Sequence, residues 1–341
     1  MPSPSVESSL ILPDLHARWP FPSIRSHLAK TIPLETQSWI ESSGVLSAPL
    51  RKKLEASNFG ELASIAYVHV SDAEKYRVCC DFLSLLFIMD DTTDDLGVNE
   101  VKAVFAIATD ALKNHDKPRP VGENPIGELH RSFSERLHKV SRQNVTERFV
   151  LNYDLYAKAV IAEAEDREAN KIRTLDSYLA IRRETGGVIC CFDLHLLCAE
   201  VPDEILRDEH LRRLETLGLD MICIGNDILS FNVEYARGDL HNAVVIVMHE
   251  NNLSIQEAIS FVEILYQKMV DEFCRIAIHD LPACGSVTTR NAIRMYVAGI
   301  TSWVTANYEW SLDCRRYFPG GQNPADTNWV VPVVPLIRQQ K

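Results

Sequence analysis

The stretch FLSLLFIMDDTTDD, residues 82–95, joins an apolar run directly to four aspartates. On a helix Asp90 and Asp94 share one face, one turn apart, and Asp91 lies beside them. Carboxylates placed so closely repel one another unless a cation neutralises them. Oxygen-only ligands suit a hard ion such as Mg²⁺, which often bridges carboxylates to a phosphate. The stretch therefore predicts a magnesium-binding helix end or, as the simpler alternative, a solvated acidic one.

A second polar group emerges from an apolar helix in MICIGNDILSFNVEYARGDLH, residues 221–241. Asn226, Ser230 and Glu234 follow one another at intervals of four, so each step drifts by only about 40° around a helix. An amide oxygen, a hydroxyl and a carboxylate on one stripe form a candidate oxygen site for another metal ion. The alternative is that Ser230 bonds to a main-chain carbonyl while Asn226 and Glu234 are solvated.

The rest of the chain repeats the helical pattern. Apolar residues recur at three- and four-residue spacing, and the alternation typical of strands is scarce, which predicts an all-α protein. Residues 1–341 are expected to form a single domain, with an extended arm at 1–30 and an irregular, proline-rich tail at 319–341. A surface loop is expected at 114–125. Helices are expected at about 48–57, 59–69, 73–95, 98–113, 125–139, 143–169, 174–199 (with a break at Gly186–Gly187), 203–236, 241–250, 254–280 and 286–314.

Composition narrows the partners and the compartment. A formal net charge of -12 would repel a phosphate backbone, so nucleic acid is not expected as a partner. Nine cysteines are an odd number, and many lie in apolar stretches, which predicts reduced thiols. The first residues lack a basic segment followed by a signal-length apolar core, and nowhere do about 18 uninterrupted apolar residues occur. We therefore expect a cytoplasmic protein without a stable membrane anchor.

Taken together, the two acidic motifs resemble a known family. DDxxD followed by NDxxSxxxE is the paired signature of class I terpene synthases, and NDILSFNVEYARGDLHN is similar to the fungal, basidiomycete-type sesquiterpene synthases. The resemblance extends from about Leu12 to Phe318. It implies a single-domain α-helical bundle around an apolar pocket, with three Mg²⁺ ions at its mouth. It also implies that Asp90 binds two of the ions, that Asp91 and Asp94 support it, and that Asn226, Ser230 and Glu234 bind the third ion and Asn226 also contacts the substrate.

The same resemblance suggests where the substrate's diphosphate is held. The segment YLAIRRETGG, residues 178–187, resembles the diphosphate-sensing helix break of the family. Its spacing from the second motif suggests Arg182 as the sensor, with Arg183 as a close competitor. Thr185 and Gly186 fall at the break and are expected to contact the substrate.

The C-terminal segment EWSLDCRRYFPGG matches the terminal Arg-Tyr pair of the family at Arg316 and Tyr317. Phe87, one turn before Asp90, and Trp310 are expected by motif position to be aromatic rings of the pocket, although plain core packing explains a single aromatic residue in an apolar helix better. One departure stands out. Many relatives carry Lys immediately before the Glu of the second motif, and here that position is Val233, so that contact is missing or replaced.

These residues imply a lyase. Its metals, with Asp90, Arg182, Arg316 and Tyr317 as catalytic residues, would promote ionisation of a prenyl diphosphate, most readily farnesyl diphosphate. The carbocation would then cyclise to a sesquiterpene, and diphosphate would be released. The alternatives are a synthase of an acyclic, linalool- or nerolidol-type alcohol, a prenyltransferase, which is expected to show a second DDxxD, and a non-catalytic helical scaffold. A monomer and a homodimer are both compatible with the sequence.

Overall fold

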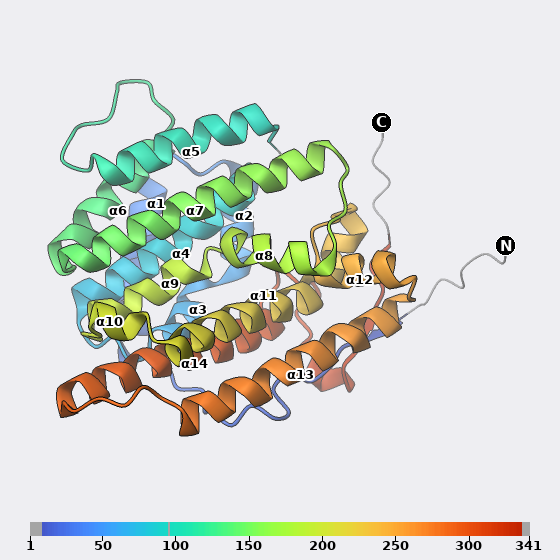
Figure 1. Cartoon of the computed structure of the whole chain (residues 1–341). Coiled ribbons are helices and arrows are strands. Elements are labelled where there is room, and N and C mark those ends of the chain that lie inside the picture. Colours follow the sequence, from blue (N-terminus) through green and yellow to red (C-terminus); the bar gives the residue numbers. More distant parts are fainter. Residues whose placement is uncertain (1–8, 95, 336–341) are drawn as a thin grey trace.

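Helices dominate the computed structural model, which describes residues 9–94 and 96–335 (Figure 1). The all-α prediction is confirmed. The α-helices are α1 (Ile32–Ser42), α2 (Ala48–Ser57), α3 (Phe59–Ala66), α4 (Ala73–Thr93), α5 (Val98–Lys113), α6 (Ile126–Val140), α7 (Gln143–Glu168), α8 (Leu175–Thr185), α9 (Val188–Asp193), α10 (Asp203–Leu206), α11 (Glu209–Arg237), α12 (Ala243–Asn251), α13 (Ile255–His279) and α14 (Val287–Asp313). Short 3-10 turns are η1 (His27–Lys30), η2 (Leu194–Leu197) and η3 (Pro324–Thr327), and the strands are β1 (Ser9–Ile11) and β2 (Val330–Pro332).

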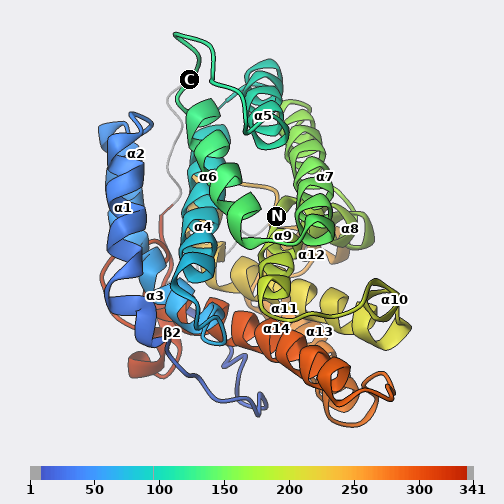
Figure 2. The same ribbon diagram turned by 90° about the vertical axis from the view of Figure 1, so that its left-hand side faces the viewer.

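Two long helices carry the predicted metal motifs and lie in the middle of the bundle. Helix α4 packs against α1, α2, α3 and α6, and helix α11 packs against α8, α12, α13 and α14. Figure 2 shows α1 and α2 flanking α4 and α6, with α13 and α14 beside α11. Both central helices are buried along the turns that precede their polar motifs, which explains the apolar runs at residues 82–89 of α4 and 221–225 of α11.

The break expected at Gly186–Gly187 is confirmed, and packing against α4 explains it. Gly187 has φ 62°, and a Cβ atom there would lie 2.6 Å from Leu86 Cδ1. Only glycine combines this backbone conformation with so close an approach. Helix α8 therefore ends at the inner edge of α4, and the chain restarts as α9.

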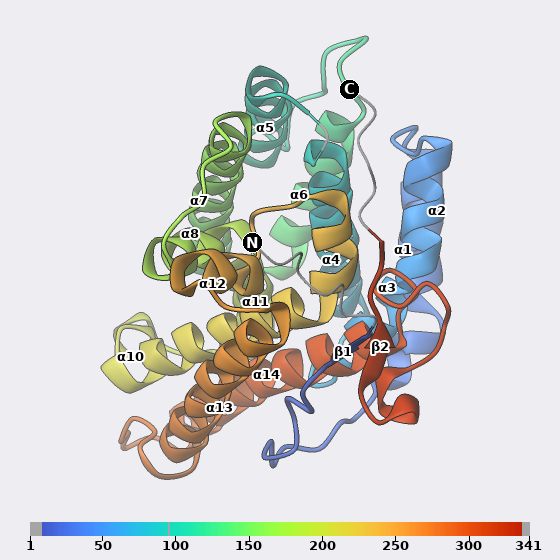
Figure 3. The same cartoon turned by 90° about the vertical axis from the view of Figure 1, so that its right-hand side faces the viewer.

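The structure differs from the sequence-based expectations near both ends of the chain. Helix α1 was not among the expected helices; Thr36 lies in its buried stripe between Ile32 and Ile40, and the Thr36 hydroxyl donates to Asp81 Oδ1 at 2.6 Å in the core. The expected irregular tail contains η3 and β2. Strand β2 forms an antiparallel pair with β1 of the N-terminal arm (Figure 3). Residues 1–8 of the expected arm and 336–341 of the expected tail lie outside the described residues.

Among the described helices, none combines the length and the apolarity that a membrane crossing requires.

Candidate active site

The first predicted motif forms one wall of a cavity at the C-terminal end of α4. One carboxylate oxygen from each of Asp90, Asp91 and Asp94 lies within 4.8 Å of the others. Asp90 and Asp94 line the cavity, whereas the Asp91 side chain is only 1% exposed. Arg316 donates to both oxygens of Asp91 at 3.1 and 2.9 Å, and Lys53 Nζ lies 3.1 Å from Asp91 Oδ1. Asp91 therefore pairs with Arg316 and Lys53, whereas Asp90 and Asp94 face the cavity.

The nearby cations of the protein do not fully neutralise the carboxylates of this wall. Burial, and then the charge of Asp90, raises the pKa of Asp94 to about 8. Burial and the neighbouring Asp91 also raise the pKa of Asp90, although Arg316, 3.2 Å from Asp90 Oδ2, opposes the shift. A group of carboxylates in this condition favours a bound cation.

The second predicted motif forms the facing wall on α11. Asn226 and Glu234 line the cavity, and Ser230 lies between them, fully buried. Ser230 Oγ has no hydrogen-bond partner within the described part of the chain, so the alternative that it bonds to a main-chain carbonyl does not hold. Burial raises the pKa of Glu234 to about 7. Buried hydroxyls are rarely left without a partner, and an oxygen-seeking ion between these three side chains supplies one. The donor set thus fits Mg²⁺.

Asp227, next to Asn226, organises this wall from behind. Its carboxylate, 1% exposed, accepts from Tyr178 OH at 2.6 Å, from Arg182 Nε at 3.2 Å and from the Ala243 amide at 3.0 Å. It thereby fixes an arginine of the cavity and the start of α12. The sequence analysis gave it no role. Its only signal was a carboxylate one residue outside the ligand stripe, next to the apolar run at residues 221–225.

The two neighbouring arginines of α8 point to different places. Arg182 lines the cavity and donates to Asn226 Oδ1 at 3.0 Å. Arg183 turns to Asp220, with which it makes two hydrogen bonds of 2.7 and 2.9 Å, and does not line the cavity. Thr185 and Gly186 line the cavity at the end of the helix. A Cβ atom at Gly186 would lie 2.9 Å from Cys223 Sγ, so glycine allows α8 to approach α11.

The C-terminal pair follows α14 and closes the polar mouth. Arg316 and Tyr317 both line the cavity. Arg316 joins the first wall through Asp90 and Asp91, as described above, and Asn226 Nδ2 donates to Tyr317 OH at 2.7 Å in the second wall. The pair therefore bridges the two candidate metal sites.

The interior of the cavity is aromatic and aliphatic. Phe87 and Trp310 line it, with ring centroids 5.5 Å apart. Phe59, which the sequence analysis did not single out, stacks on Phe87 at 4.2 Å and lies 5.9 Å from Trp310. Aliphatic side chains from α3, α4, α8, α9 and α11 complete the lining: Leu62, Leu83, Leu86, Ile181, Val188 and Ile222.

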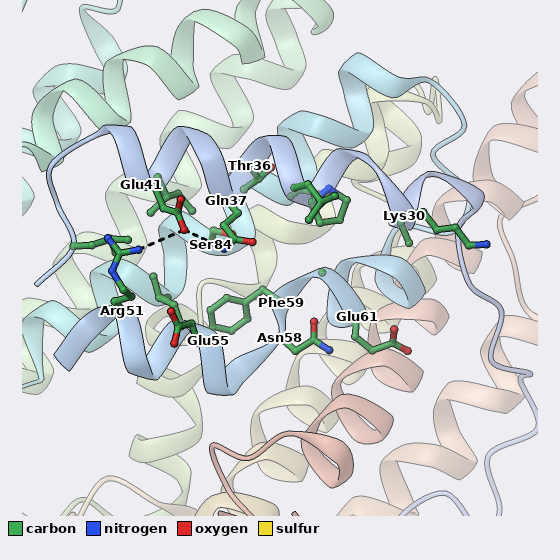
Figure 4. A pocket seen from close by; sticks show the side chains of 18 residues that line it. Lys30, Thr36, Gln37, Glu41, Arg51, Glu55, Asn58, Phe59, Glu61 and Ser84 are labelled. Atoms are coloured by element: carbon green, nitrogen blue, oxygen red, sulfur yellow. Dashed lines mark hydrogen bonds and ion pairs between the residues drawn. The ribbon is translucent and has the colours of Figure 1, made fainter. Parts of the chain in front are cut away.

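A second cavity lies behind Phe59, between α1, α2, α3 and α4 (Figure 4). Its volume of about 460 Å³ exceeds the about 160 Å³ of the first cavity. Its charged lining is partly neutralised by the pair of Arg51 and Glu41 at 3.4 Å. Within the described residues, the only cluster of three or more His, Cys, Asp or Glu side chains close enough to share a metal ion is Asp90, Asp91 and Asp94. The chemistry therefore belongs to the smaller cavity.

Known proteins share these features. The family profile described as "Terpene synthase family 2, C-terminal metal binding" matches residues 81–272, which include both motifs. A Delta(6)-protoilludene synthase of Stereum hirsutum is 36% identical over 318 residues, which cover 93% of this chain and 85% of the relative. The chain belongs to the terpene synthase family. Sesquiterpene synthase 9 of Postia placenta is 34% identical to this synthase over 310 residues, or 91% of this chain and 89% of the relative.

Solved structures share the fold of the synthase. A hedycaryol synthase in complex with HEPES superposes with a TM-score of 0.76 at 19% identity, over 88% of this chain and 98% of that one. A germacradien-4-ol synthase from Streptomyces citricolor gives a TM-score of 0.72 at 23% identity, over 86% and 96%. The matched family profile is that of a metal-binding domain, so the synthase uses a divalent metal.

The C-terminal end of α11 and the loop after it supply cavity side chains that were not predicted from the sequence. Val233 is half-buried, and Arg237, one turn further, lines the cavity and donates to the Val233 carbonyl at 3.3 Å. Arg237 pairs with no carboxylate among residues 9–94 and 96–335. Gly238, with φ 84°, ends the helix so that Asp239 and His241 also line the cavity. The synthase therefore carries a cavity-lining cation one turn after Val233, the position where the family resemblance implies Lys.

Proposed function

We propose that this terpene synthase ionises farnesyl diphosphate and cyclises the resulting carbocation to a sesquiterpene, with release of diphosphate. One observation carries the proposal: two walls of oxygen ligands, three guanidinium groups and an aromatic interior meet at a single cavity. The preference for the C15 substrate rests on the relatives, which are named Delta(6)-protoilludene and sesquiterpene synthases.

The polar mouth is proposed to hold the diphosphate. Asp90 and Asp94 on one wall, and Asn226, Ser230 and Glu234 on the other, would hold three Mg²⁺ ions. Mg²⁺ bound there supplies positive charge to the diphosphate oxygens. Arg182 and Arg316 present fixed forks of N–H donors, which suit phosphate oxygens.

Hydrogen-bond donors of the protein stabilise the leaving diphosphate as the allylic C–O bond breaks. The electron pair of that bond leaves with the diphosphate oxygen, and negative charge grows there. Arg182, Arg316 and the Tyr317 hydroxyl already converge on the mouth through Asn226 and Asp90. Donors that are fixed before the reaction stabilise this charge without reorganising, which lowers the barrier.

The interior is proposed to hold the polyene and to protect the carbocation. The faces of Phe87 and Trp310 bury the hydrocarbon and attract a nearby cation, a contribution of about 0.5 to 2 kcal/mol per ring, while Phe59 stacks on Phe87 from outside the cavity lining. Exclusion of water by these side chains favours loss of a proton over capture as an alcohol.

Incubation with C10, C15 and C20 prenyl diphosphates and Mg²⁺, followed by analysis of volatile products and of released diphosphate, tests the proposal. We expect cyclic C15 hydrocarbons from farnesyl diphosphate. Failure to release diphosphate from any of the three substrates refutes the function, and acyclic alcohols as sole products refute the cyclisation. We also propose that residues 1–341 form one catalytic domain and that the protein is cytoplasmic. The protein is either a monomer or a homodimer, and analytical ultracentrifugation distinguishes these two states.

A further inference from the structure

Asn232 lies within the second motif but serves the opposite face of α11. It follows Ser230 by two residues, a rotation of about 200° around a helix, so it points away from the metal ligands. Its side-chain amide donates to the Pro332 carbonyl at 2.8 Å and accepts from the Val334 amide at 2.8 Å. One side chain thus pairs with the main chain of a segment about 100 residues away.

That segment is the C-terminal strap, which we define as residues 318–335. It starts directly after Arg316 and Tyr317 and is held along its length. Asn323 donates to Asp313 Oδ1 at 2.7 Å near its start, and the Leu12 amide donates to the Trp329 carbonyl at 2.9 Å. Strand β2 then pairs with β1 before the chain reaches Asn232 (Figure 3).

Helix α11 therefore forms hydrogen bonds with the chain after α14 at two points, Tyr317 and the strap. On its inner face Asn226 donates to Tyr317 OH at 2.7 Å, and on its outer face Asn232 binds the strap. The segment between these points forms a closed loop, and fixing one end of a loop restricts the positions open to the other. The strap contacts lie outside the cavity, so they are available before any substrate binds.

Asparagine has the chemistry that this position requires. The strap presents an acceptor at Pro332, which has no N–H group of its own, and a donor at Val334. A primary amide offers one donor and one acceptor side by side and satisfies both groups. A carboxylate of the same shape would face the Pro332 carbonyl with a second acceptor and lose that bond.

We propose that Asn232 is a positioning residue of the synthase: by binding the strap to the back of the triad helix, it holds Arg316 and Tyr317 over the diphosphate site. The inference rests on the proposed function for its effect on turnover. Its structural part, a strap fixed by Asn232, stands without that function.

The test uses two full-length variants. Asn232→Ala removes the side chain that binds the strap, and Val334→Pro removes the main-chain N–H group that donates to Asn232. We expect each to lower kcat/KM for farnesyl diphosphate about tenfold, the factor that ordinary net hydrogen bonds supply. We also expect a higher share of water-captured alcohols, because the mouth closes less completely. The double variant should lose little more than Asn232→Ala alone, since Asn232→Ala already removes the hydrogen bond that Val334→Pro removes. Asn99→Ala, at an exposed position of α5, is the control and should leave kcat/KM and products unchanged.

Hydrogen exchange of residues 314–335 is the readout that does not need turnover. In the wild type the Val334 amide should be protected, and Asn232→Ala should speed its exchange and that of the Tyr317 segment while the melting temperature stays close to the wild-type value. Losses that multiply in the double variant, or an unchanged exchange rate in Asn232→Ala, overturn the proposal. A wild-type protein that releases no diphosphate refutes the proposed function instead, and the exchange experiment still decides the role of Asn232.

Discussion

Asp227→Asn separates the role of a buried counter-ion from that of the metal ligands. The substitution keeps the shape of the side chain but removes the charge that faces Arg182, whose Nη2 lies 3.1 Å from Asp227 Oδ1. The two side chains are 1% and 21% exposed, so the arginine is left largely buried with an amide in place of its carboxylate partner. Removing one partner of such a pair costs about 3–5 kcal/mol of unfolding free energy.

The effect on catalysis follows from the position of Arg182. An arginine that no longer has its fixed partner is not held over the mouth of the cavity. Loss of one preorganised donor costs about 10²–10³ in kcat. We therefore expect Asp227→Asn to lose turnover of farnesyl diphosphate by that factor, measured by product formation, and to unfold at a lower urea concentration.

Asp220→Asn is the matched control, since Asp220 pairs with Arg183 between the same two helices but outside the cavity. It should lose less stability, because the Arg183 side chain is 38% exposed, and keep kcat within about threefold, because Arg183 does not line the cavity. If Asp227→Asn keeps near-wild-type kcat, or if both variants lose kcat equally, Asp227 does not act by holding Arg182.

Three further outcomes are expected. Asp90→Asn and Glu234→Gln should each abolish turnover while the circular dichroism spectrum, and so the helical content, stays unchanged. Near-full activity in either variant would show that the wall carrying that residue does not bind a catalytic metal. Because the pKa of Asp94 is raised to about 8 and that of Glu234 to about 7, the native metal-free protein binds more protons than the unfolded chain, so its free energy of unfolding should fall as pH rises from about 5 to 8. Mg²⁺ with diphosphate should therefore raise the melting temperature more at pH 8 than at pH 6, because the carboxylates are then ionised. Equal shifts at the two pH values would contradict metal binding by Asp94 and Glu234. Arg237→Gln should weaken inhibition by diphosphate about fivefold, whereas Arg212→Gln, on the same helix outside the cavity, should not; equal inhibition constants would remove Arg237 from the site.

Much of the fold was accessible from local patterns, and the predictions failed where residues distant in the sequence stabilise an element. Helices α2 and α5 begin and end where the apolar spacing and the flanking residues predict. Helix α1 was missed because Thr36 lies in its buried stripe, and its polarity is satisfied only by Asp81, which is distant in the sequence. Strand β2 was missed because a three-residue strand between prolines is stabilised by its pairing with β1 and by Asn232 rather than by its own composition.

The sequence by itself determined which kinds of atom the site offers: carboxylates at the end of α4, and an amide, a hydroxyl and a carboxylate at intervals of four on α11. These are local properties, because helical spacing alone puts them on one face. Only the tertiary structure decided which neighbouring residue faces the cavity. Successive residues on a helix differ by about 100°, so Arg182 and Arg183, or Asp90 and Asp91, were interchangeable until long-range partners fixed the rotation. Asp220 holds Arg183 outside the cavity, and Arg316 and Lys53, from opposite ends of the chain, hold Asp91 away from it.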